Sequence, residues 1–329
     1  MVKKILLKKK SLILIAITIF SLILSACAAT PVNTPAPTKT PIPATHTPEP
    51  QPIVLTDALG KIITLPSPAN RVISLAPSNT EILYAVGADS QVVGRDAFSD
   101  FPAEAQALTD IGGGFGALNT EAIISLDADL VLAADLTPPE QIQAIEDLGL
   151  TVFALPNPND FNTLYDNLRT VAALTGHETE ASQLIETLEK RVSIVQETIS
   201  KTETRPLVFY ELDASDVNAP YTAGPGTFID FLIKTAGGNN LGSSMDSPWV
   251  QISVEELIIQ DPEIIILGDY TWGGITPEDV AGRSGWDVIN AVKNAKVYTF
   301  DDNLVSRPGP RLVEGLETMA RLIHPELFE

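Results

Sequence analysis

The sequence predicts an α/β protein with two similar lobes of mainly parallel sheet flanked by helices, joined by a long helix. Short β-rich runs alternate with helical stretches through most of the chain, which is typical of βα units. A long helical segment interrupts this alternation near the middle, and the two halves on either side resemble each other. Ligands commonly bind between domains, so we expect a ligand cleft between the lobes.

Composition excludes several classes of function. The 329 residues, 44% of them hydrophobic, are enough for two lobes with buried cores. A formal net charge of −21 repels nucleic-acid phosphates over much of the surface. One cysteine forbids an internal disulfide or multi-cysteine cluster, and three histidines leave few ways to build a His-rich metal centre. We therefore expect no nucleic-acid partner, no metal site and no resident cofactor.

Residues 1–26 have the layout of a secretory signal. Five lysines precede the apolar run 12–24, which is too short for a comfortable membrane-spanning helix of about 20 residues. The sequence Leu24-Ser25-Ala26-Cys27 resembles the bacterial lipobox, which implies cleavage before Cys27 and diacylation of its sulfur. An uncleaved anchor with an incidental cysteine is the alternative. Either way, we expect the protein outside the cytoplasm, anchored to the cell membrane.

Residues 27–52 are a predicted tether. Between Pro31 and Pro52, eight of 22 residues are Pro and five are Thr, a composition that favours extended polyproline conformations. Removing residues 1–26, with five lysines and no acidic residue, changes the charge to (21 − 5) − 42 = −26. The exported part is therefore more acidic than the whole chain.

The remaining chain divides into three predicted parts. The N-terminal lobe, residues 53–158, begins with a short hairpin over 53–64 and continues with βα units. In the helical linker, residues 159–203, apolar residues recur every three or four positions with an interruption near Gly176, so one or two helices are expected. The C-terminal lobe, residues 204–329, resumes the alternation and ends in a helix.

An internal repeat supports the duplicated architecture. Residues 118–132 align with 252–266 without gaps at a constant offset of 255 − 121 = 134. Arg71 also aligns with Arg205 at this offset. The alternative is a chance match, because amphipathic helices align easily with one another.

An ordered set of motifs resembles the cobalamin and ferric-siderophore binding proteins of ABC importers. The motifs are Arg71–Glu81, Asp96–Pro102, Asn218–Gly224, Ala236–Asn240, Pro248–Gln251 and Arg307–Arg311. The match covers the chain from about Ile53 to its end, and Asn218–Gly224 and Ser247–Trp249 look closest to the cobalamin-binding branch. The resemblance implies a monomeric lipoprotein that delivers cobalamin or a related corrinoid to a permease dimer with ATPase subunits. Ferric siderophores and haem are the alternative ligands.

The same resemblance identifies residues that would line the cleft. Cobalamin is a large flat ring with amide side chains, so its site needs aromatic faces and scattered polar groups. By their match to the family's motifs, Phe98, Phe115, Tyr221 and Trp249 would line the cleft, and Arg307 would add charge or hydrogen bonds. Each aromatic alone fits ordinary packing equally well. Haem binders generally supply a Tyr or His axial ligand, for which Tyr221 is the only candidate at the rim.

A glycine-rich run over Gly112–Gly116 has two interpretations. It could cradle a phosphate before a helix, but no Lys-Ser or Lys-Thr follows and the chain is acidic. A rim loop that presents Phe115 to the cleft is the better interpretation.

Glu121 and Glu255 occupy matching positions in the two halves. Asn119 and Ser253 look like N-caps, so both acids could simply favour the first turn of their helices. In the resembled family, a Glu at this position in each lobe docks onto arginines of the permease. A two-fold permease needs two similar contacts, which a duplicated protein supplies.

Enzymatic function finds little support. Serine-centred catalysis needs a histidine base, but His177 lies at a helix break, and His324 lies near the terminus, far from any Gly-x-Ser-x-Gly motif. We therefore predict no catalytic residues. An exported hydrolase, a tethered sensor and an adhesion module are the other classes.

Overall fold

The structure is a computed structural model that describes residues 51–114 and 116–328. These described residues form one compact unit. The predicted signal peptide, Cys27, most of the tether and Phe115 lie outside the described residues. Within the described ranges, every helix is too short or too polar to span a bilayer.

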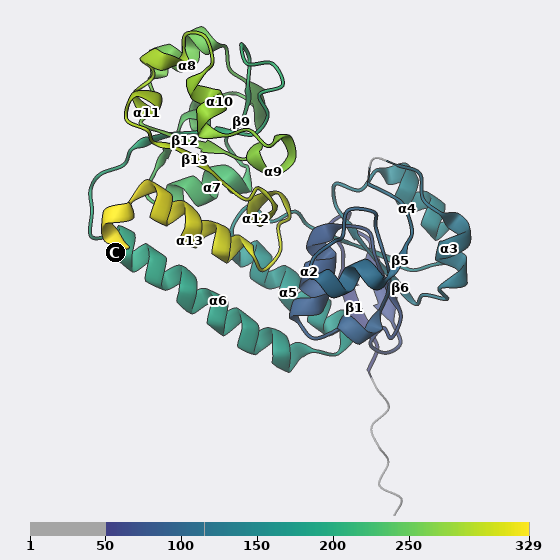
Figure 1. Ribbon diagram of the computed structural model, residues 1–329. Coiled ribbons are helices and arrows are strands. Elements are labelled where there is room, and N and C mark those ends of the chain that lie inside the picture. The colour runs from purple at the N-terminus through teal and green to yellow at the C-terminus, as the bar shows by residue number, and fades with distance from the viewer. Residues whose placement is uncertain (1–50, 115, 329) are drawn as a thin grey trace, which may run out of the picture. The chain divides into compact units, whose positions relative to one another are not determined.

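A five-stranded parallel sheet is the centre of the N-terminal lobe. Its strand order is β5 (Thr109–Asp110), β4 (Val92–Arg95), β3 (Val72–Ser74), β6 (Leu130–Ala134) and β7 (Val152–Leu155). Figure 1 shows the flanking helices, which are α2 (Pro77–Ala85), α3 (Thr120–Ser125) and α4 (Pro139–Glu146). The predicted hairpin is present as antiparallel β1 (Ile53–Thr56) and β2 (Ile62–Leu65).

The C-terminal lobe has a four-stranded parallel sheet and a separate small ladder. The sheet order is β10 (Asn239–Asn240), β8 (Leu207–Glu211), β12 (Ile264–Leu267) and β13 (Val297–Thr299). The antiparallel ladder pairs β9 (Tyr221–Ala223) with β11 (Trp249–Gln251). The helices are α7 (Phe228–Thr235), α8 (Val254–Gln260), α9 (Tyr270–Gly273), α10 (Pro277–Ala281), α11 (Asn290–Lys293), α12 (Asn303–Ser306) and α13 (Leu312–Ile323). The predicted α/β class with mainly parallel sheets is confirmed.

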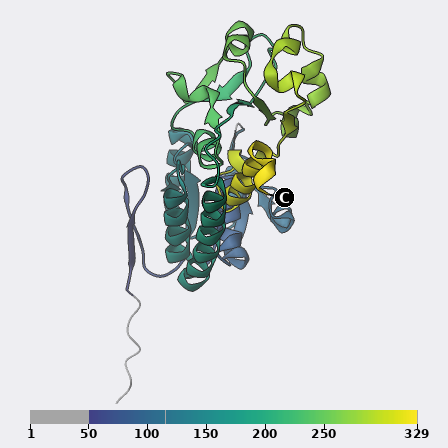
Figure 2. The same ribbon diagram turned by 90° about the vertical axis from the view of Figure 1, so that its left-hand side faces the viewer.

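Two helices, rather than one, connect the lobes. They are α5 (Phe161–Thr175) and the 22-residue α6 (Glu178–Ile199), which lie side by side (Figure 2). Between them, Gly176 adopts the left-handed conformation (φ 80°) that glycine tolerates best, and this residue ends α5. The interruption that the sequence shows near Gly176 is therefore this turn.

The linker packs against both lobes. At the start of α5, the ring of Phe161 lies 5.7 Å from that of Phe228 in α7, and at its end Leu174 accepts a hydrogen bond from the Ala69 amide. One hydrophobic cluster runs continuously through the linker and both lobes and includes Val72, Leu130, Leu168, Val192, Val208, Ile233 and Met319. Moving one lobe against the other would break this packing, so the linker is stiff.

The internal repeat is visible in the backbone of α3 and α8. Asn119 accepts a hydrogen bond from the Ala122 amide, and Ser253 accepts one from the Glu256 amide. Past the ends of these helices, Asp127 (φ 45°) and Asp261 (φ 49°) both adopt the left-handed conformation, which is uncommon for residues other than glycine. Each pair is separated by 134 positions, as the alignment predicts.

The repeat register changes between the first strand of each lobe and the repeated helix. Val72 pairs with Leu130, whereas Val208 pairs with Ile264, so the offset between the first strands is 208 − 72 = 136. The structural counterpart of Arg71 is therefore Leu207, and matching Arg71 with Arg205 is wrong. The C-terminal lobe therefore has two fewer residues between its first strand and the repeated helix, 253 − 208 = 45 against 119 − 72 = 47.

Candidate ligand-binding site

A cavity of about 960 Å³ lies between the two lobes. Leu75, Asp96 and Ala134 line it where β3, β4 and β6 end, and Leu212 lines it where β8 ends. In open α/β sheets, ligands bind outside the carboxyl ends of the strands, and this cavity lies at the carboxyl ends of both sheets. Its volume falls at the upper end of the range for small-molecule sites, which suits a large ligand.

Two exposed aromatic rings line the cavity from opposite lobes. Phe98, in the loop after β4, is 42% exposed, and Trp249 is 52% exposed. Trp249 is the first residue of β11 and pairs with Ala223 of β9. The small ladder therefore holds Trp249 at the cavity. Burying such rings against a flat ligand would remove apolar surface from water on both of its faces.

Tyr221 is not among the described residues that line this cavity. It is the first residue of β9, is 40% exposed, and pairs with Gln251 on the neighbouring strand. The cavity thus brings together Phe98, Trp249 and Arg307 but not Tyr221. Phe115 lies outside the described residues, so its place in the cleft stays a prediction.

The glycine run forms part of the cavity rim. Gly112, Gly113 and Gly114 all have positive φ, and Gly114 lines the cavity. A side chain at Gly114 would overlap the ring of Phe98, so a glycine at this position lets the ring keep its place.

Neutral polar groups make up most of the cavity's hydrogen-bonding capacity. Among the described lining residues, the charged side chains are those of Asp96 and Arg307, and none is His, Tyr, Met or Cys. The neutral polar residues, which sequence reasoning did not single out, are Ser78, Thr137, Gln141, Asn157, Thr227 and Ser306. Sequence reasoning also missed Leu136, a 75% exposed apolar side chain at the cavity. The described residues contain no group of three or more His, Cys, Asp or Glu placed to hold a metal ion.

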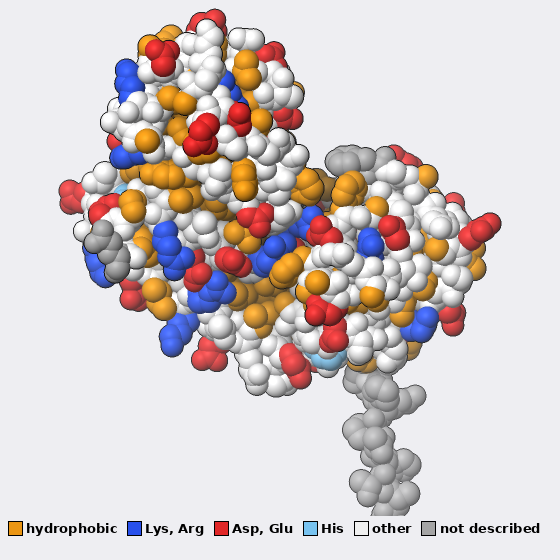
Figure 3. Space-filling view, in the orientation of Figure 1, with side chains coloured by type: hydrophobic (Ala, Val, Ile, Leu, Met, Phe, Trp, Pro, Cys, Tyr) orange, Lys and Arg blue, Asp and Glu red, His pale blue; other side chains and the backbone are white. Residues whose placement is uncertain are grey.

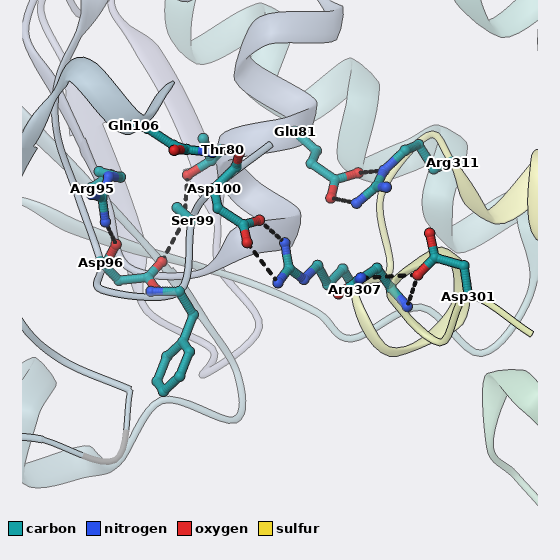
Figure 4. A network of polar contacts seen from close by, with 12 residues as sticks. Thr80, Glu81, Arg95, Asp96, Ser99, Asp100, Gln106, Asp301, Arg307 and Arg311 are labelled. Atoms are coloured by element: carbon teal, nitrogen blue, oxygen red, sulfur yellow. Dashed lines mark hydrogen bonds and ion pairs between the residues drawn. The ribbon is translucent and has the colours of Figure 1, made fainter. Parts of the chain in front are cut away.

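Internal hydrogen bonds stiffen the loop that carries Phe98. The carboxylate of Asp96, 1% exposed, accepts hydrogen bonds from the Phe98 amide (2.7 Å) and the Ser99 hydroxyl (2.6 Å) (Figure 4). Thr80 Oγ1 lies 2.7 Å from Ser99 Oγ and so ties the loop to α2. Burial raises the pKa of the Asp96 carboxyl, and the hydrogen bonds from Ser99 and Phe98 oppose this rise.

Consecutive polar residues of α2 connect it to three different parts of the molecule. Asn79 donates to the Leu132 carbonyl of β6 (3.1 Å), Thr80 reaches the Phe98 loop, and Glu81 reaches the C-terminal lobe. All three residues are buried. These contacts give the buried polar side chains of α2 the hydrogen-bond partners that buried polar groups need.

Two arginines of the C-terminal lobe pair with carboxylates of the N-terminal lobe. Arg311 donates to Glu81 through Nε (2.9 Å) and a terminal nitrogen (2.5 Å), while Arg307 pairs with Asp100, as Figure 4 shows. Burial raises the pKa of Glu81 although Arg311 opposes it, whereas the hydrogen bond from Arg307 lowers the pKa of Asp100. Both pairs cross between the lobes beside the cavity.

Glu121 and Glu255 occupy equivalent places in the two lobes. Each is the second residue of its helix, α3 or α8, and each is exposed. Asn119 and Ser253 cap these helices, so the glutamates are not needed as N-caps. The geometry leaves both carboxylates free to meet a partner at the surface, and their docking role stays a prediction.

Residues 72–304 match the model of the protein family described as "Periplasmic binding protein". The chain belongs to this family. Within the periplasmic binding proteins, an uncharacterized ABC transporter substrate-binding lipoprotein of Bacillus subtilis is 33% identical over 285 residues, covering 84% of this chain and 87% of the relative. A cobalamin-binding protein of Halobacterium salinarum is 29% identical over 283 residues, covering 83% of this chain and 74% of the relative.

A solved structure from the same family has a similar fold. It is described as a possible iron-binding (periplasmic solute-binding) protein from Staphylococcus epidermidis. It is 30% identical in sequence, with a TM-score of 0.69 over 78% of this chain and 99% of the other. Members of this family bind transported substrates outside the cytoplasm. The protein is thus an extracytoplasmic substrate-binding protein of the ABC-importer type.

Proposed function

We propose that this protein captures cobalamin or a related corrinoid between its lobes and delivers it to an ABC permease. The observation that carries the proposal is that two exposed aromatic rings, Phe98 and Trp249, line one large cavity from opposite lobes. A flat macrocycle between them would bury apolar surface on both faces. The neutral polar groups among the described lining residues suit the amides at the rim of a corrinoid.

Haem is less compatible with the described part of this cavity. Haem iron in proteins is held by His, Cys, Met or Tyr, and no described lining residue is of these types. Tyr221, the axial ligand that the sequence suggested, lies outside the described lining. These observations support a ligand that brings its own coordination sphere, as a corrinoid or a ferric siderophore does.

A ferric siderophore is the second candidate. The observation that favours it is the 30% identity to the Staphylococcus epidermidis protein described as possibly iron-binding. The 29% identity to a cobalamin-binding protein over a similar share of the chain supports the corrinoid instead. Because the two ligand classes differ in charge and shape, a direct titration separates them.

The proposed function also includes attachment of the protein to the membrane and delivery of the ligand to the permease. A lipid on Cys27 would hold the protein at the membrane, as the name of the Bacillus subtilis relative suggests. Glu121 and Glu255, exposed at the start of equivalent helices, would each contact one subunit of the permease dimer. Their two-fold placement in a duplicated protein supports this assignment.

The proposal is tested by titrating the full-length protein in detergent with cyanocobalamin, ferrichrome and haem, followed by absorbance. We expect submicromolar binding of cyanocobalamin and much weaker binding of the other two. Submicromolar binding of ferrichrome or haem without measurable corrinoid binding would overturn the proposed ligand.

A further inference from the structure

An ion pair between the two lobes lies at the edge of the cavity. Arg307 is the one cation among the described lining residues, and its side chain is 8% exposed. Both of its terminal nitrogens donate to Asp100, one of them at 3.5 Å. Asp100 lies on the N-terminal lobe, and its side chain is 56% exposed. An accessible carboxylate thus covers a buried guanidinium at the edge of the cavity.

The other charged groups nearby are already held by hydrogen bonds. Glu81 accepts two hydrogen bonds from Arg311, so these two charges cancel. Asp96, the other charged lining residue, uses its carboxylate on the amide of Phe98 and the hydroxyl of Ser99. Arg307 is therefore balanced by Asp100, whose pKa is lowered by the hydrogen bond from Arg307.

A lone arginine in such a site would favour anions. Its planar guanidinium binds carboxylates through two parallel hydrogen bonds, and these charge-assisted bonds are stronger than neutral ones. With Asp100 in place, an anionic ligand must displace this carboxylate to reach Arg307 and is repelled by it. An uncharged amide can bind beside the pair without breaking it.

We propose that Asp100 sets the charge selectivity of the cavity, so that it accepts an uncharged, amide-bearing ligand and rejects carboxylate-bearing ones. This inference rests on the proposed function because it refines which ligand the same site takes. Asp100 acts through Arg307 and is a specificity-determining residue. Its loop also carries Phe98, so one segment contributes both the aromatic face and the neutralising charge.

The test compares two ligands that differ by one group. Full-length protein in detergent is titrated with cyanocobalamin and with the separated isomers in which one peripheral amide is hydrolysed to a carboxylate. The wild type should prefer the amide. In Asp100→Asn, the ratio of the two dissociation constants should shift by about tenfold toward the carboxylate for at least one isomer, since Arg307 is freed for a charge-assisted pair.

The controls separate this effect from folding and from net charge. A ratio measured on one variant does not depend on the fraction of folded protein. Glu104→Gln removes one charge from an exposed residue outside the described cavity lining and should leave the ratio at its wild-type value. An equal ratio in the wild type and Asp100→Asn for every isomer would overturn the inference.

Failure of the proposed function gives a different result. If the wild type binds no corrinoid, the proposed ligand is wrong, and the same variants are titrated with neutral ferrichrome and the anionic complex ferric enterobactin. Charge selectivity by Asp100 then predicts that Asp100→Asn gains affinity for the anionic complex relative to the neutral one. No change in that preference would contradict it.

Discussion

The carboxylate of Glu81 receives two hydrogen bonds from Arg311, at 2.9 and 2.5 Å, and this pair joins the two lobes. The Glu81 side chain is 1% exposed and that of Arg311 is 16% exposed. Arg311 also lies 3.9 Å from the ring centroid of Phe101. With the continuous hydrophobic cluster, this pair fixes the lobes at a set separation, as a preformed site for a rigid ligand requires.

Removing Glu81 should destabilise the protein. Glu81→Ala leaves the largely buried Arg311 without its carboxylate, and we expect unfolding free energy to fall by about 3 kcal/mol in urea denaturation. Asp166→Ala is the control, because its pair with Arg169 is exposed and should contribute less than about 1 kcal/mol. Equal losses of unfolding free energy in both variants would show that the inter-lobe pair stabilises the protein no more than an exposed ion pair does.

A buried carboxyl in the C-terminal lobe should make stability depend on pH. Burial, together with the charge of nearby Glu211, raises the pKa of Asp269 from 3.8 to about 7. Between these values the folded protein holds a proton that the unfolded chain has lost, so the contribution of Asp269 to stability falls as pH rises. Glu211 also pairs with Arg283 at 2.5 Å, which partly offsets the rise.

Asp269→Asn removes this titration. The unfolding free energy of the variant minus that of the wild type should increase as pH rises from about 5 to about 8. Comparing the two proteins at each pH cancels the titration of the other carboxylates. A difference that is constant over this range would contradict the raised pKa.

Replacing Gly114 should weaken binding through Phe98. In Gly114→Ala, the added methyl group overlaps the ring of Phe98, which must move from its place at the cavity. Gly149→Ala is a matched control in the same lobe, since it also has positive φ but has nothing within 4 Å of the added carbon. We expect cyanocobalamin affinity to fall in the first variant and not in the second. Equal affinities would show that the position of Phe98 is not important for binding.

The docking prediction has a matched control within the chain. Changing Glu121 and Glu255 together to Ala should leave stability and ligand affinity nearly unchanged and abolish uptake by the reconstituted transporter. Glu140 and Glu278 are also exposed and are also the second residues of their helices, α4 and α10. Their double Ala variant should transport normally. Normal transport by the first variant would place the docking surface elsewhere.

Local patterns predicted the elements better than they predicted the site. Hydrophobic periodicity and the break near Gly176 indicated the strands and linker helices, because these depend on residues close in sequence. The pairing of Arg307 with Asp100 joins residues 207 positions apart, and no local pattern encodes it. Similarly, the place of Tyr221 outside the described cavity lining depends on how β9 pairs with β11, which residue type alone does not determine.

Calorimetric titration of full-length protein with cyanocobalamin tests most directly whether the ligand lies between the two aromatic rings. The wild type should bind one molecule, and Phe98→Ala/Trp249→Ala should lose about 2–4 kcal/mol of binding free energy, because both faces of the ring lose an aromatic contact. The control, Ile124→Ala/Ile259→Ala, removes two exposed apolar side chains from α3 and α8, outside the described lining, and should bind like the wild type. Wild-type affinity in the aromatic double variant, or no corrinoid binding by the wild type, would contradict a corrinoid site between Phe98 and Trp249.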